Sequence, residues 1–193
     1  MGRIIHFINQ SLDGFIEGPN GEFDWPIMDP ELSEYSRAAS AEADEFLYGR
    51  VVWDMMSSYW PKAAEISDHP HDLEYAPIWV AKPKVVMSRS LRSADWNTRV
   101  VNSPDELAAI KNEEDKTLII FGGSDMASNL TRLGLIDEYR ILVHPVLLGG
   151  GKPVFTDVKL RQALRLVESR TFDNQVVMLR HELAETTALN MDR

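Results

Sequence analysis

The chain has 193 residues, of which 44% are hydrophobic and 26% charged, as in ordinary globular proteins. Its formal net charge of -10 argues against general nucleic-acid binding, because phosphate contacts need clustered Lys and Arg. The absence of cysteine excludes disulfides, thiolate zinc sites and cysteine nucleophiles. No stretch approaches about 18 consecutive apolar residues, and the N-terminus lacks a signal-peptide core. We therefore expect no membrane association and a cytoplasmic location.

The first quarter of the chain alternates between strand-like and helix-like patterns. Residues 3–9 (RIIHFIN) have the character of a buried strand. Residues 10–26 contain three Gly and two Pro, which predicts a long loop. A helix is expected over 29–43, because Asp29-Pro30-Glu31 supplies an N-cap, a proline at the first helical position and an early acid. The next segments predict a strand over 45–49 and a helix over about 50–59.

The middle of the chain is less regular. Residues 61–77 are polar and bounded by prolines, which suggests a surface excursion. Strands are expected near 78–81 and 84–88, and a helix beginning at 103–106 (SPDE). The aliphatic run TLIIFGG, 117–123, predicts another strand.

The last third begins with a predicted helix over 124–134 that ends at Gly134. Residues 137–148 are again strand-like, and 164–183 form two alternating strands that split at Asp173-Asn174, a hairpin. The repeated change of periodicity is typical of an α/β domain. We expect one domain over 1–185, followed by a tail at 186–193.

Two glycines stand where the strand ending near Phe121 gives way to a helix. This arrangement brings the free N–H groups and the positive dipole end of the helix to the sheet edge, where they can bind a phosphate. Ser124 could cap the helix or donate to that phosphate, whereas the Asp125 carboxylate would compete with it. A tight turn without any ligand explains Gly122-Gly123 equally well.

Two further strand ends carry guanidinium groups. Gly49-Arg50 follows one predicted strand, and Ser88-Arg89-Ser90 follows another. Arginine suits phosphate groups, and ligands of open α/β sheets bind beyond the carboxyl ends of the strands. Either arginine alone is compatible with a solvated surface position. Three such strand ends together favour a nucleotide with several phosphates.

The loop over 11–31 mixes several carboxylates with Trp25, and such a loop could hold a heterocycle or pass a proton. The alternative is structural: Asp13-Gly14 is a turn dipeptide, Asp29 a helix cap and Trp25 a core residue. His69 and His71 lie two apart on a polar segment without an evident third ligand, so no metal site is expected. The other histidines stand singly in strand patterns, which indicates structural roles.

In combination these motifs resemble the dihydrofolate-reductase-like family, and in particular stand-alone bacterial proteins related to the C-terminal reductase domain of riboflavin biosynthesis. The resemblance covers about residues 3–183. It rests on motifs that occur in the family order: SLDGFIEGPNGEFDW, YGRVVWDMMSSYWP, VVMSRSL, LIIFGGSDMASNLTRLGLIDEYRILVHPVLLGGGKPVF and the closing hairpin. It implies a single α/β domain with a mixed central sheet flanked by helices.

The resemblance also implies NADPH as the cofactor, laid across the strand ends, and roles for individual residues. Its 2′-phosphate end and neighbouring parts would lie against Gly49, Arg50, Val51, Val52, Ser88, Arg89 and Ser90. Its pyrophosphate would lie against Gly122, Gly123, Ser124, Asp125 and Met126, and its nicotinamide near Ile16. Substrate contacts would come from Ser11, Trp25 and Trp53, and catalytic acids from Asp13 and Asp29.

Two departures from the family pattern bear on the substrate. Val52 replaces a hydroxyl residue that often follows the Gly-Arg pair, which removes a possible phosphate donor. Asp29 and Glu31 flank the place of the acid that pairs with pterin in true dihydrofolate reductases, which argues against dihydrofolate as the substrate.

The sequence therefore favours an NADPH-dependent reductase of a small heterocycle, of pteridine or aminopyrimidine type. The alternative is a nucleotide-binding or ligand-sensing protein that keeps the fold without turnover. The apolar HPVLL segment and the terminal hairpin, together with the resemblance, favour a homodimer. No nucleic acid, membrane or metal partner is expected.

Overall fold

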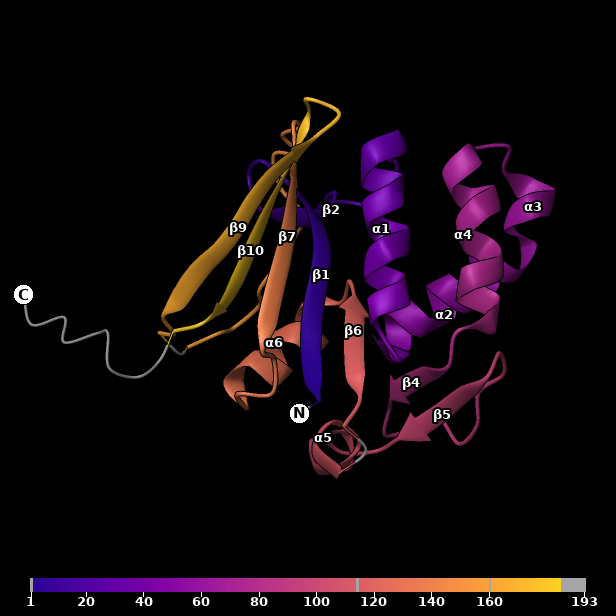
Figure 1. The fold of residues 1–193 in the computed structure, drawn as a ribbon, viewed down its shortest axis with the longest axis vertical. Helices are drawn as coiled ribbons and strands as arrows, with labels where there is room; N and C mark the ends of the chain where they lie inside the picture. Colours follow the sequence, from indigo (N-terminus) through magenta and orange to yellow (C-terminus); the bar gives the residue numbers. More distant parts are fainter. Residues whose placement is uncertain (1, 114, 160, 185–193) are drawn as a thin grey trace, which may run out of the picture.

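The structure is a computed structural model that describes residues 2–113, 115–159 and 161–184. Its centre is an eight-stranded sheet in the order β5-β4-β3-β6-β1-β7-β10-β9, and β2 pairs with β8 in a separate two-stranded sheet (Figure 1). The strands are β1 Arg3–Ser11, β2 Phe15–Glu17, β3 Glu45–Gly49, β4 Lys84–Met87, β5 Thr98–Val101, β6 Thr117–Phe121, β7 Glu138–His144, β8 Lys152–Pro153, β9 Leu164–Phe172 and β10 Val176–Leu183.

Pairing within the sheet is mixed, as the sequence predicted. Neighbouring strands in the part of the sheet ordered β5-β4-β3-β6-β1-β7 pair in parallel. Strand β10 runs antiparallel to both β7 and β9. Parallel strands need crossover connections, which the helices supply. These are α1 Pro30–Glu42, α2 Arg50–Tyr59, α3 Ala63–Ile66, α4 Pro70–Ala81, α5 Pro104–Glu113 and α6 Ser124–Arg132, with a 3-10 turn η1 at Trp60–Lys62.

Both faces of the parallel strands are buried, which explains their continuous aliphatic runs. One core cluster joins α1 and α4 to the sheet through residues such as Leu32, Tyr75 and Trp79. The other packs α5 and α6 on the opposite face, through residues such as Leu107 and Leu130. The predicted α/β class, its mixed sheet and its flanking helices are confirmed.

The terminal hairpin is also confirmed. Asp173 and Asn174 have φ values of 50° and 56°, the left-handed pair of a type I′ turn, and a hydrogen bond from Gln175 N–H to Phe172 O at 2.9 Å closes that turn. The edge strand β9 is exposed from Leu164 to Thr171. The predicted tail at 186–193 lies outside the described residues.

Two predictions for the middle of the chain were wrong. Residues 61–77 are not an irregular excursion but contain η1, α3 and most of α4, and the strand expected at 78–81 is the last turn of α4. Pro70 begins that helix. Tyr75 and Trp79 lie one turn apart and pack into the core, where they are 4% and 0% exposed. Burial of these aromatic rings outweighs the strand-like character of Ile78-Trp79-Val80.

Three short strands were not predicted. β2 interrupts the loop expected over 10–26, β8 pairs with it, and β5 forms the far edge of the large sheet. Each has two to four residues, too few to show an alternating pattern, so their pairing comes from the tertiary structure.

Candidate active site

A cavity of about 1270 Å³ opens at the carboxyl ends of four neighbouring strands, β4, β3, β6 and β1. It continues between α1, α2 and α4. Its strand-end half is lined by Gly49, Arg50, Ser88, Arg89, Gly122 and Gly123. The three strand ends singled out from the sequence therefore lie on one cavity, because adjacent parallel strands end at the same edge of a sheet.

The Gly122-Gly123 pair lies between β6 and α6. Their φ values are 79° and 80°, in the left-handed region that favours glycine. The first hydrogen bond of the helix runs from Ala127 N–H to Gly123 O, at 2.9 Å. The N–H groups of the first turn before Ala127 are therefore not used by the helix, and they lie at its positive end beside the cavity.

Both arginines belong to the cavity wall. Arg50 begins α2, and its Nε donates to the two carboxylate oxygens of Asp54, at 2.8 and 2.7 Å. This bond orients the guanidinium and leaves its Nη groups for a ligand. Arg89 follows Ser88, whose Oγ accepts from the N–H groups of Ser90 and Leu91 at 3.3 and 3.1 Å and so closes the turn after β4.

The remaining residues assigned to the cofactor divide into two groups. Ile16, Val51, Val52, Asp125 and Met126 also line the cavity, whereas Ser90 and Ser124 are not part of its wall. The Ser124 hydroxyl donates to the backbone oxygen of Pro153 and is buried, so it is not available to a phosphate. Ser124 thus anchors the segment that carries β8.

Asp125 does not compete for the helix N-terminus. Its carboxylate accepts from Lys152 Nζ at 3.1 Å and from Thr156 Oγ1 at 3.0 Å. The bonds from Lys152 and Thr156 lower the pKa of Asp125. Its charge is therefore paired at the rim of the cavity.

Neither predicted catalytic acid lines the cavity. Asp13 accepts from the backbone N–H groups of Leu148 and Gly149, at 3.1 and 2.8 Å, which ties two loops together. A hydrogen bond from Ser11 and these backbone N–H groups lower the pKa of Asp13. Ser11 itself is buried and accepts from Phe15 N–H at 2.9 Å. In the described structure both side chains thus make structural contacts, and neither lines the cavity.

Asp29 also makes structural contacts. It occupies the N-cap position of α1 without a side-chain cap, and it accepts instead from Gln175 Nε2 at 2.9 Å. The cap is supplied from the hairpin turn, where the Asp173 carboxylate accepts from the N–H groups of Glu31 and Leu32. Asp29 therefore joins α1 to the hairpin, outside the cavity wall.

Neither tryptophan assigned to the substrate is part of the cavity wall. Trp53 is 5% exposed and stacks on Trp79 with ring centroids 5.8 Å apart. Trp25 packs edge-on against His144, at 5.4 Å. Trp53 is therefore a core residue, whereas Trp25 is half-buried and belongs to none of the core clusters of the described residues.

Asn9, at the end of β1, is a cavity residue that the sequence did not indicate. His144 Nδ1 accepts from Ile27 N–H at 3.1 Å, so the ring proton is on Nε2, which donates to Asn9 Oδ1 at 3.0 Å. The Asn9 amide NH₂ has no partner among the described residues and is left for a ligand. Burial lowers the pKa of His144 to about 4, which keeps this ring neutral.

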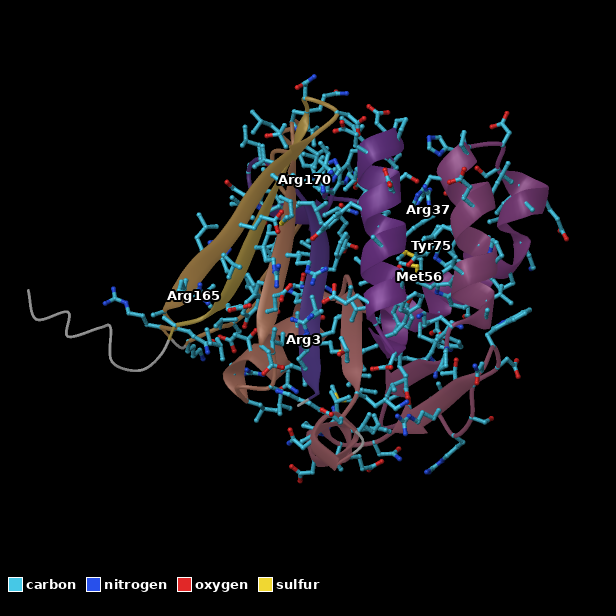
Figure 2. The ribbon with its side chains drawn as sticks, viewed as in Figure 1. Arg3, Arg37, Met56, Tyr75, Arg165 and Arg170 are labelled. Carbon is cyan, nitrogen blue, oxygen red and sulfur yellow. The ribbon has the colours of Figure 1, made fainter. Side chains whose placement is uncertain are left out.

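The helical half of the cavity contains an aromatic pocket formed by Trp60, His71, Asp72, Tyr75 and Phe121. The rings of Trp60 and Tyr75 are 4.8 Å apart, His71 stacks on Tyr75 at 5.3 Å, and Phe121 lies 6.4 Å from Tyr75. Figure 2 shows Tyr75 in the space between α1 and α4. Sequence analysis missed this pocket because it placed 61–77 on the surface.

No group of three or more His, Cys, Asp or Glu residues in the part of the chain that the structure describes could hold a metal ion. No helix within those residues is long and apolar enough to cross a membrane.

Comparison with known proteins agrees with this architecture. The family model of the RibD C-terminal domain matches residues 3–178. The uncharacterized protein YyaP of Bacillus subtilis (strain 168) is 38% identical over 179 residues, which are 92% of this chain and 93% of that protein.

Two solved structures share the fold at low identity. One is the Thermotoga maritima diaminohydroxyphosphoribosylaminopyrimidine deaminase/5-amino-6-(5-phosphoribosylamino)uracil reductase, with a TM-score of 0.65 and 15% identity over 95% of this chain and 57% of that one. The other is Enterococcus faecalis dihydrofolate reductase complexed with NADP(H) and RAB-propyl, with a TM-score of 0.66 and 14% identity over 95% of this chain and 98% of that one. The chain belongs to the RibD C-terminal domain family and has the dihydrofolate-reductase-like fold.

Proposed function

We propose that this protein is an NADPH-dependent reductase that transfers hydride to a small heterocycle. The observation that carries the proposal is the placement of Arg50, Arg89 and the Gly122-Gly123 helix start on one cavity that continues into an aromatic pocket. A solved structure of the same fold, the Enterococcus faecalis dihydrofolate reductase, is a complex with NADP(H).

The residues present fit a phosphorylated dinucleotide. A cavity of about 1270 Å³ exceeds the roughly 300–1000 Å³ of pockets for one drug-sized ligand, so a cofactor and a substrate fit side by side. The unused N–H groups at the start of α6 suit a pyrophosphate. Arg50 and Arg89 supply two cations for a further phosphate, and the nicotinamide end would approach Ile16 and Asn9.

Reduced NADPH supplies a hydride when it is bound, and the protein's part is to hold both reactants in place. In this arrangement the strand ends orient the phosphates, and Asn9 presents its amide donor to the cavity from β1. Ile8 and Ile16, 5% and 8% exposed, belong to one apolar cluster and add apolar surface to the cavity wall.

The experiment that tests this function measures NADPH and NADH binding by quenching of tryptophan fluorescence. Arg50→Gln should weaken NADPH binding at least tenfold and NADH binding little, because only NADPH has a 2′-phosphate. A charge-assisted contact of this kind contributes about 1.5–3 kcal/mol. Arg92→Gln, an exposed position outside the cavity wall, is the matched control. Absence of NADPH binding at high micromolar concentration would contradict the proposal.

The second candidate function is a ligand sensor that binds the nucleotide without turnover. It is distinguished by absorbance at 340 nm during a screen of pteridines and aminopyrimidines. Oxidation of NADPH with any of them supports the reductase, whereas binding without oxidation across the panel favours the sensor.

We also propose a homodimer. The edge strand β9 exposes Leu164, Leu166 and Val167, and an unpaired apolar edge is a natural place for a second copy to pair. Light scattering should give twice the mass of one chain, and Leu166→Lys should reduce it to that of a monomer. A monomeric wild-type peak would exclude the dimer.

A further inference from the structure

Cations are distributed unevenly along the cavity. Its cationic side chains among the described residues are Arg50 and Arg89 at the strand ends and Lys152, which is paired with Asp125 at the rim. The aromatic pocket instead carries a carboxylate, Asp72. The two halves of the cavity therefore suit ligand groups of opposite charge.

The nearest cation on α1 does not enter this pocket. Arg37 is outside the cavity wall, and its Nη1 donates to Ser33 Oγ at 3.0 Å and to the Glu74 carboxylate. Figure 2 shows Arg37 between α1 and α4. A phosphate placed in the aromatic pocket would lie against Asp72 without a compensating charge, which is unfavourable where water is scarce.

The polar groups of the pocket are partly used by the protein and partly left for a ligand. Asp72 Oδ2 accepts from the Tyr59 hydroxyl at 2.7 Å and from Ser67 Oγ at 2.6 Å, whereas Oδ1 has no partner among the described residues. His71 Nδ1 is hydrogen-bonded to Ser33 Oγ at 2.8 Å, so Nε2 is the ring nitrogen that could bond to a ligand. Burial lowers the pKa of His71, so its ring is neutral at pH 7.

We propose that the aromatic pocket binds a flat nitrogen heterocycle that carries N–H donors and no phosphate, and that Asp72 determines this specificity. The rings of Trp60, His71 and Tyr75 supply flat apolar surface, and the free oxygen of Asp72 accepts from an amino or ring N–H group. The substrate class thus differs from the phosphoribosyl compound in the name of the Thermotoga maritima reductase. This inference rests on the proposed function, because it gives the strand-end half to the cofactor.

The test uses calorimetric titration of three probes: 2,4-diaminopyrimidine, cytidine and cytidine 5′-monophosphate. Each is titrated into protein saturated with NADP⁺. Each is also titrated into the Arg50→Gln/Arg89→Gln variant without cofactor, where the strand ends have lost the cations that would capture a phosphate. The second titration is independent of cofactor binding, so failure of NADP⁺ to bind would contradict the proposed function without deciding the specificity of the pocket.

Both uncharged probes should bind, and cytidine 5′-monophosphate should bind at least about tenfold more weakly than cytidine in both proteins. Asp72→Asn keeps the shape and can still accept from Tyr59, yet it should weaken 2,4-diaminopyrimidine about tenfold and reduce the discrimination against the phosphate. Glu65→Gln removes an exposed charge on α3. It should change neither the affinity for 2,4-diaminopyrimidine nor the ratio of the affinities for cytidine and its monophosphate. Equal binding of cytidine and its monophosphate, no binding of any probe, or no effect of Asp72→Asn would overturn the proposal.

Discussion

His144 Nε2 donates to Asn9 Oδ1 at 3.0 Å, and this bond determines which end of the Asn9 amide faces the cavity. The opposite ring nitrogen accepts from Ile27 N–H, so one buried ring connects β7, β1 and the loop before α1. An isolated histidine in a strand pattern thus has the structural role expected from the sequence, but it also orients a cavity residue.

His144→Phe should destabilise the protein, because Ile27 N–H and Asn9 Oδ1 lose their partner in a buried place. An unsatisfied buried polar group costs about 1–3 kcal/mol, and urea unfolding at pH 7 measures the difference. His181→Phe, on β10 and without a side-chain hydrogen bond among the described residues, is the control and should change stability by less than about 0.5 kcal/mol. Equal losses for the two variants would contradict the role of the His144 bonds.

Acid should destabilise the protein through two buried histidines. Burial lowers the pKa values of His6 and His144 from 6.5 to about 4. Between pH 6.5 and about 4 the unfolded chain binds protons that the folded chain does not, so stability falls as the pH falls, by up to roughly 1.4 kcal/mol per pH unit for each histidine. Above pH 6.5 this contribution is constant. Urea unfolding from pH 7.5 to 4.5 measures the slope.

A single substitution separates the two histidines. Both ring nitrogens of His6 are buried without a hydrogen-bond partner, beside Tyr139 and Phe155. His6→Leu should therefore reduce the slope between pH 6.5 and pH 5 by the contribution of one histidine, up to roughly 1.4 kcal/mol per pH unit, without leaving a partner group unsatisfied. An unchanged slope would show that other groups cause the acid sensitivity.

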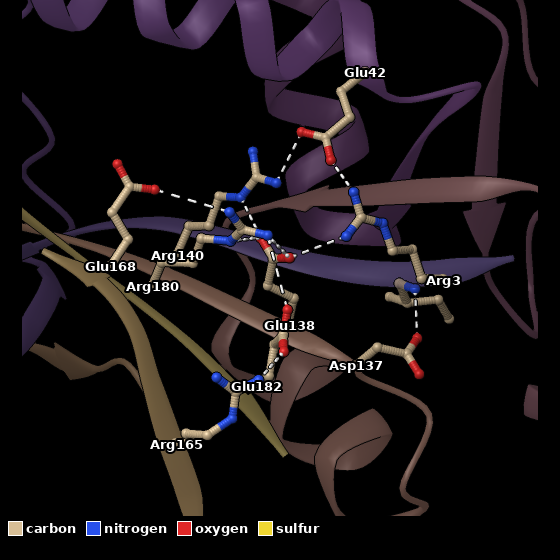
Figure 3. A network of polar contacts seen from close by, with 10 residues as sticks. Arg3, Glu42, Asp137, Glu138, Arg140, Arg165, Glu168, Arg180 and Glu182 are labelled. Atoms are coloured by element: carbon tan, nitrogen blue, oxygen red, sulfur yellow. Dashed lines mark hydrogen bonds and ion pairs between the residues drawn. The ribbon is translucent and has the colours of Figure 1, made fainter. Parts of the chain in front are cut away.

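Glu138 is the buried centre of an ion-pair network. It is 0% exposed and accepts from Arg3, Arg140 and Arg180, while Arg140 and Arg3 also pair with Glu42 (Figure 3). Glu138→Gln should destabilise the protein by up to about 3–5 kcal/mol, because it removes the fully buried carboxylate on which three guanidinium groups converge and leaves the buried Arg140 with Glu42 as its counter-charge.

Glu182→Gln is the matched control for this network. Glu182, whose side chain is 33% exposed, pairs on the hairpin with the exposed Arg165 and with Arg180 (Figure 3). Because exposed pairs contribute only about 0–1 kcal/mol, its free energy of unfolding should change little. A loss for Glu182→Gln as large as that for Glu138→Gln would refute the assignment of Glu138 as the buried centre.

Gly123→Ala should weaken NADPH binding and stability together. Its φ of 80° strains any residue with a Cβ, and that Cβ would lie 3.4 Å from Val52 Cγ2 at the cavity wall. Gly134→Ala has a comparable φ of 66° with open space around the added Cβ, so it should lose stability alone, by about 1 kcal/mol. Fluorescence titration with NADPH distinguishes the two, and equal affinities would show that the glycine is needed only for the turn.

Much of the local structure could be predicted because its causes are local. Pro30, after Asp29, begins α1, and Asp173-Asn174 forms the turn of the hairpin. Gly134, with a positive φ, follows the last turn of α6 and prevents its continuation. Each depends on the φ preference or hydrogen-bonding capacity of one or two residues. Gly49-Arg50 and Gly122-Gly123 could be placed at strand ends for the same reason.

The sequence by itself thus determined the α/β class, the terminal hairpin and the glycine and arginine residues at three strand ends, since these follow from periodicity and backbone preference. Only the tertiary structure decided which polar groups face the cavity. In the tertiary structure Ser124 donates to Pro153 O, and Asp13 accepts from Gly149 N–H. Asp72 on α4 lines the same cavity as the rings of the aromatic pocket. These contacts join residues far apart in the chain, and their energies depend on burial and on partners that no local pattern reveals.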